Sequence, residues 1–118
     1  MHEIQDYLTP EGKDPFKNWL ESVVDRMARA RVLARVQRMG AGNFGDCKPL
    51  NGGVWELRID QGPGYRVYYA KAGSRLILLL IGGDKTGDKR WYETHVPIAD
   101  RLYDAHLEQL KKEGLING

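Results

Sequence analysis

The chain has 118 residues, of which 42% are hydrophobic and 29% are charged, and its formal net charge is +2. This composition excludes a disordered or fibrous chain, and the length predicts a single domain, residues 1–118, without a second lobe for a large cofactor. A net charge this small does not by itself indicate a nucleic-acid partner.

The cellular compartment is suggested by the absence of targeting features. No apolar run approaches the roughly 20 residues that a membrane span requires, and the first residues do not resemble a signal peptide. We therefore expect a cytoplasmic protein with no membrane partner. Cys47 is the only cysteine, which excludes an internal disulfide and a zinc site built from cysteines. We expect neither a metal nor a cofactor.

The first predicted elements are a short strand over residues 3–8 and a helix that begins at Pro15. Asp14 is placed to cap this helix, because its carboxylate can accept a free backbone N–H and proline lacks one. Apolar residues recur at three- and four-residue spacing, which predicts a buried stripe. The stripe consists of Phe16, Trp19, Leu20, Val23, Val24 and Met27.

A second helical segment is predicted from about Ala28 to Met39, and Gly40 is placed to end it. The short connection allows either an antiparallel helical hairpin or one bent helix. No acidic residue neutralises this part of the chain before Asp46, although it carries Arg26, Arg29, Arg31, Arg35 and Arg38. Such a block predicts an anionic partner, either nucleic acid or an acidic protein, or else a solvated helix face.

The segment 41–53 is rich in glycine and aperiodic, so we expect a loop there. An antiparallel meander should follow, because apolar and charged residues alternate over residues 54–60 and place Glu56 and Arg58 on an outward face. Arg66 shares the polar face of the next strand. Ion pairs from the two arginines to Glu56 and Asp60 are one explanation for this pattern.

A third strand is predicted over Leu76–Ile81, which is apolar at every position, as expected for a strand covered on both faces. This strand leads to Lys85. A last amphipathic helix is predicted from about Pro97 and should end before Gly114.

Three phrases resemble a known family. They are G-N-F-G-D-C-K-P-L at Gly42–Leu50, E-L-R-I-D-Q-G-P-G-Y-R-V-Y-Y at Glu56–Tyr69 and L-L-L-I-G-G-D-K at Leu78–Lys85. With the order of elements, they resemble the RelE/ParE superfamily of type II toxins, and within it the HigB-like addiction-module killer proteins. The resemblance implies an α+β, RelE-like fold. Its antiparallel sheet of about four strands, in the order β-α-α-β-β-β-α, packs against an N-terminal helix pair, and a C-terminal helix follows.

The resemblance also implies a function. Members are small cytoplasmic toxins neutralised by a cognate antitoxin, and many cut messenger RNA on the ribosome without a metal, through attack of a ribose 2′-hydroxyl on the scissile phosphate. The implied partners are a small helix-turn-helix antitoxin from an adjacent gene and mRNA on the ribosome, with operator DNA bound only through the antitoxin. The alternatives are a ParE-like gyrase poison and a catalytically inactive antitoxin-binding module.

The resemblance assigns roles to individual residues. Arg66 matches the arginine that binds phosphate on the sheet, and Arg58 is the second contact. Lys85 would neutralise charge in the transition state, and either Tyr92 or His95 would transfer a proton. Lys48 and Arg90 are the remaining candidates for RNA binding. Both could equally be ordinary solvent-exposed residues on the surface. The chain has Val54 and Glu56 where RelE carries lysines.

Overall fold

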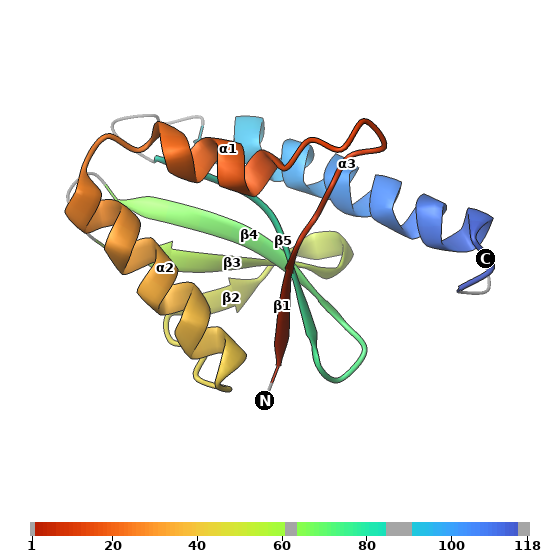
Figure 1. Ribbon diagram of the computed structural model, residues 1–118, viewed down its shortest axis with the longest axis horizontal. Coiled ribbons are helices and arrows are strands. Elements are labelled where there is room, and N and C mark those ends of the chain that lie inside the picture. The colour runs from red at the N-terminus through yellow and green to blue at the C-terminus, as the bar shows by residue number, and fades with distance from the viewer. Residues whose placement is uncertain (1, 61–63, 85–90, 116–118) are drawn as a thin grey trace.

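In a computed structural model, which describes residues 2–60, 64–84 and 91–115, the chain folds into a five-stranded sheet with helices on both faces (Figure 1). The elements in chain order are β1 (Glu3–Asp6), α1 (Pro15–Ser22), α2 (Arg26–Gly40), β2 (Cys47–Pro49), a short 3-10 turn (Asn51–Gly53), β3 (Val54–Ile59), β4 (Tyr65–Ala72), β5 (Leu76–Asp84) and α3 (Trp91–Lys112).

The strand order is β1-β5-β4-β3-β2, with β1 parallel to β5 and the other neighbours antiparallel. The α+β class is therefore confirmed, but two details of the prediction are wrong for the described residues. The sheet is mixed rather than antiparallel, and it has five strands rather than about four. The additional strand is β2, which lies in the segment predicted to be a loop. Three residues are too few to show a period, so the pattern could not reveal it.

The strands contribute side chains alternately to two hydrophobic cores. The core under α1 and α2 takes Leu57, Val67, Tyr69, Ile77 and Leu79 from the sheet. The core under α3 takes Val54, Tyr68, Ala70, Leu78 and Leu80. β5 contributes to both cores, which confirms that this apolar strand is covered on both faces.

Helix α1 begins as predicted. The carboxylate of Asp14 accepts a hydrogen bond from the backbone N–H of Lys17 at 2.9 Å, and Pro15 occupies the first turn. This helix ends at Ser22, and a second cap follows at once, because Asp25 accepts hydrogen bonds from the N–H groups of Met27 and Ala28. Of the two alternatives left open by the sequence, one bent helix is excluded, because α1 and α2 are separately capped.

The second cap corrects part of the predicted stripe. Phe16, Leu20 and Val23 are buried, but Val24 is 93% exposed and Met27 is 70% exposed. A helix that restarts at Arg26 has a new direction and phase, so the three- and four-residue spacing no longer places Val24 and Met27 against the core.

Helix α3 begins at Trp91, six residues before the predicted start, and Pro97 lies inside it. Proline removes one backbone donor from the helix and is costly there. Packing of Val96, Ala99 and Leu102 against the sheet compensates for this loss. Within the described residues, none of the helices combines the length and the apolar character needed to cross a bilayer.

Asp6, at the end of β1, makes stability dependent on pH. Burial and a hydrogen bond with Asp14 raise the pKa of its carboxyl from 3.8 to about 7. Because the folded chain keeps a proton that the unfolded chain releases, the free energy of unfolding falls as pH rises from about 4 to about 7.

Asp6→Asn should remove this penalty, since the amide can donate to Asp14 without losing a proton. We expect the variant to be more stable than the parent by about 1 kcal/mol at pH 8, after allowance for solvent screening, and equally stable near pH 4. Urea unfolding at both pH values measures the difference. Glu3→Gln, on the exposed side of the same strand, is the control, and an equal effect of both substitutions would refute the prediction.

Candidate functional site

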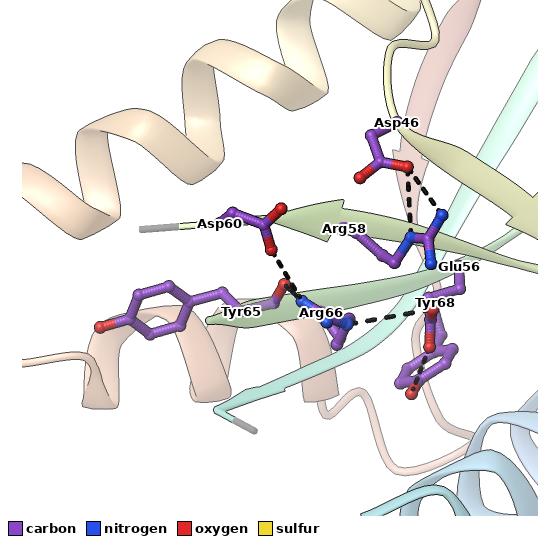
Figure 2. Close-up of polar contacts among 7 residues, drawn as sticks. All are labelled: Asp46, Glu56, Arg58, Asp60, Tyr65, Arg66 and Tyr68. Atoms are coloured by element: carbon purple, nitrogen blue, oxygen red, sulfur yellow. Dashed lines mark hydrogen bonds and ion pairs between the residues drawn. The ribbon is translucent and has the colours of Figure 1, made fainter. Parts of the chain in front are cut away.

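Two arginines meet at one end of the sheet. Arg58 of β3 and Arg66 of β4 are direct partners in the antiparallel register, so their side chains leave the same face of adjacent strands (Figure 2). This is the face that α3 covers farther along, at Val54 and Tyr68. The structure therefore brings together the two arginines that the family resemblance assigns to phosphate binding.

Arg66 is only 7% exposed, and acceptors lie around its guanidinium. Its Nη1 donates a hydrogen bond to the carbonyl oxygen of Tyr65 at 3.0 Å and lies 3.8 Å from Oδ1 of Asp60. Its Nε lies 3.9 Å from Oε1 of Glu56. The guanidinium is held in place but partly neutralised, since two carboxylates lie on its two sides (Figure 2).

Glu56 lies buried with 0% exposure, although the sequence pattern predicted an outward side chain. The pattern was wrong because α3 covers this face of the sheet, and alternation along one strand does not reveal what packs on its polar side. Oε2 accepts a hydrogen bond from the hydroxyl of Tyr68 at 3.1 Å. A pair between Arg66 and Glu56 was among the explanations that the sequence offered, but the burial of Glu56 and its hydrogen bond from Tyr68 were not predicted.

Arg58 is fixed by a residue that the sequence did not single out. Its Nε and Nη2 donate to Oδ1 of Asp46 at 3.2 and 2.9 Å, and its backbone N–H donates to the carbonyl oxygen of Asp46 at 2.9 Å. The ion pairs predicted to Glu56 and Asp60 are thus formed by Arg66, whereas Arg58 pairs with Asp46. Asp46 is twelve residues away in a loop, so no local spacing could have identified it.

Lys48 lies in β2 opposite Glu56, one row of residues away from Arg58 and Arg66 on the sheet. Its half-buried side chain is on the same face as theirs. Lys48, Arg58 and Arg66 therefore form a basic group that crosses three adjacent strands.

The other predicted site residues fall mostly outside what the structure describes. Lys85 and Arg90 lie outside the described residues, as does the side chain of Tyr92. His95 is half-buried in the second turn of α3. No cluster of three or more His, Cys, Asp or Glu side chains suited to a metal ion is present among the residues that the structure covers.

Comparison with known proteins gives one family match and two relatives. Residues 18–104 match the family described as "Phage derived protein Gp49-like (DUF891)". An uncharacterized protein of Haemophilus influenzae is 49% identical over 75 residues, which cover 63% of this chain and 76% of that protein. A Mycobacterium tuberculosis protein named "Putative toxin HigB3" is 47% identical over 47 residues, 39% of this chain and 40% of that protein.

Proposed function

The chain belongs to the Gp49-like family of phage-derived proteins, and from this premise we propose that it is the toxin of a type II toxin–antitoxin pair and cuts mRNA on the ribosome. Its similarity to the Mycobacterium tuberculosis toxin supports the first part of the proposal. The resemblance of its motifs to the RelE/ParE superfamily supports the second.

The observation that carries the nuclease proposal is the direct pairing of Arg58 and Arg66 across two strands. A phosphodiester that passes over this pair would meet two guanidinium groups, and to use the Nε and Nη2 fork of Arg58 it would have to displace Asp46. Lys48 extends the positive charge onto the next strand. Such a surface suits a reaction in which negative charge grows on phosphate oxygens.

The proposed reaction breaks one bond and forms another. The ribose 2′-oxygen attacks the adjacent phosphorus, the bond from phosphorus to the 5′-oxygen breaks, and the products are a 2′,3′-cyclic phosphate and a 5′-hydroxyl. One proton must leave the 2′-hydroxyl and one must reach the 5′-oxygen. Arg66, Arg58 and Lys85 would stabilise the charged phosphorane, and Tyr92 or His95 would transfer a proton. Glu56 is fully buried, so its role is to position Arg66 rather than to touch RNA.

A second candidate is a binding module without nuclease activity. It is favoured by the position of Glu56, whose buried carboxylate lies 3.9 Å from Nε of Arg66 where the resembled nuclease has a lysine. A carboxylate at that distance opposes the binding of a phosphate. In that case the chain would bind its antitoxin and leave RNA intact.

Inducing the chain in cells that lack the antitoxin, followed by sequencing of RNA 5′ ends, separates the candidates. The nuclease predicts growth arrest with messages cut inside translated regions. Unimpaired growth would instead support the binding module. Arrest with whole messages and broken DNA would support the gyrase poison that the superfamily resemblance left as an alternative.

A further inference from the structure

A cleft of about 640 Å³ lies between α2 and the end of β3. We name it the α2–β3 cleft. Its charged lining consists of Arg31, Arg35, Arg38, Arg58, Asp46 and Asp60. The walls between these side chains are short, because Ala30 and Ala34 stand on the helix side. The cleft therefore has room for an anionic group, such as a phosphate, between the guanidinium groups.

The basic side of the cleft is a single row on α2. Arg31, Arg35 and Arg38 are spaced by four and three residues, which places them on one side of the helix. Like charges at this spacing repel one another, so the row costs folding energy. Among the described residues no ion pair engages these three arginines, since Asp46 pairs with Arg58 and Asp60 lies beside Arg66. The row is thus positive charge without a protein counterion in the described structure.

Arg35 provides a more specific indication. Its Nη2 atom is buried and has no hydrogen-bond partner within the described chain. The guanidinium lies against Gly45, where a Cβ would come within 2.7 Å of Nη2, and Gly45 has φ +63°. A buried donor without an acceptor is costly. Because Arg35 also lines the cleft, a rotation of its side chain would bring Nη2 to an anion there, which would supply the missing acceptor.

Arg58 connects the cleft to the candidate site. It lines the cleft and is also the direct strand partner of Arg66. Because Arg58 and Arg66 leave the face of the sheet opposite α2, an anionic chain that runs from Arg66 to Arg35 would pass from one face to the other beside Arg58 and Asp46. A path of this kind favours a polymer of phosphates over an isolated anion, and RNA is favoured among anionic polymers because, under the proposed nuclease function, its backbone must reach Arg66.

We propose that the α2–β3 cleft binds a phosphodiester of single-stranded RNA next to the phosphate held by Arg58 and Arg66. This inference rests on the proposed nuclease function and adds a second phosphate site to it. The forked guanidiniums of the α2 row bind the phosphate oxygens, and the side chain of Arg35 rotates so that Nη2 leaves Gly45 and donates to the phosphate.

The test measures binding rather than cleavage. The probe is a fluorescent single-stranded RNA oligonucleotide with 2′-O-methyl groups, which lacks the attacking hydroxyl and stays intact. Its affinity for the full chain is measured by anisotropy at several salt concentrations. Arg35→Gln should weaken binding about tenfold and reduce the salt slope by about 0.7, the value for one lost phosphate contact on a single strand. Arg29→Gln is the matched control, because it removes the same charge from α2 outside the cleft.

The outcomes distinguish a failure of the proposed phosphate site in the cleft from a failure of the proposed nuclease function. Equal binding by the parent and Arg35→Gln would overturn the proposed phosphate site, even if the parent cuts mRNA in cells. If Arg35→Gln binds the RNA more weakly than the parent does, and the parent does not cut mRNA in cells, the result would support an RNA site in the cleft and refute the nuclease. A third outcome is that the chain binds a poly-glutamate peptide, but not the RNA, in a manner that depends on Arg35. That result would overturn the proposal and assign the cleft to an acidic protein. Arg35→Lys, which keeps the charge, shows whether the guanidinium fork is required.

Discussion

Replacing Arg66 with alanine is expected to lower the rate of mRNA cleavage about 100-fold or more, the usual effect of removing one preorganised donor from a developing anionic charge. Arg66 is held by Tyr65 and flanked by Glu56 and Asp60, so its guanidinium is oriented before any substrate arrives. The rate is measured with purified protein and ribosomes programmed with a defined message.

The same substitution should also weaken the fold. Glu56 is 0% exposed, and Arg66 is a cation that lies 3.9 Å from it. Removing one partner of a buried pair leaves an uncompensated charge, which costs roughly 3 kcal/mol of unfolding free energy. Loss of activity in Arg66→Ala alone would therefore be ambiguous between catalysis and stability.

A double variant separates the two effects. Glu56→Gln with Arg66→Ala removes the isolated charge, and the amide oxygen can still accept the hydrogen bond from Tyr68. We expect this variant to regain most of the lost stability in urea unfolding and to remain inactive. If cleavage returns together with stability, Arg66 acts only on the fold and the proposed phosphate contact is wrong.

Local signals in the sequence were sufficient for the elements whose causes are local. Asp14 and Pro15 predicted the start of α1, and Leu76–Ile81 predicted a strand covered on both sides, because capping chemistry and apolar runs act within a few residues. The C-terminal helix was predicted correctly, but its predicted start at Pro97 was wrong. Proline is common at the first position of a helix, which favoured that start, and the packing that allows the helix to begin earlier is not visible in the sequence.

The features that the sequence missed depend on contacts between distant segments. β1 lies parallel to β5 through pairing of Glu3 with Leu76, and nothing in either segment specifies that direction. The same limit applies to the candidate site. Alternation predicted correctly that Arg58 and Arg66 share a face, but the burial of Glu56 depends on what packs over that face, and the pairing of Arg58 requires Asp46 from a loop. A prediction made strand by strand identifies the direction of a side chain, but not its surroundings.

Gly82 provides the largest expected effect on stability away from the site. It lies inside β5, opposite Val67, although the sequence suggested that the strand ends there. A Cβ at Gly82 would overlap the indole ring of Trp19, which packs against Phe16 and Tyr65. Gly82→Ala should lower the free energy of unfolding by about 2–3 kcal/mol and the melting temperature by roughly 10 °C.

The direction of this effect is diagnostic, since alanine is better than glycine in an unobstructed strand and would otherwise stabilise the protein. The cost must arise from Trp19, and it should therefore depend on the size of that side chain. In a Trp19→Leu background, Gly82→Ala should cost little, which gives a coupling energy between the two positions of about 2 kcal/mol. Thermal and urea unfolding of the parent, the two single variants and the double variant measure this energy. If Gly82→Ala lowers the free energy of unfolding equally in both backgrounds, the contact between the indole ring of Trp19 and Gly82 is not the cause. The glycine would then be required by the strand itself.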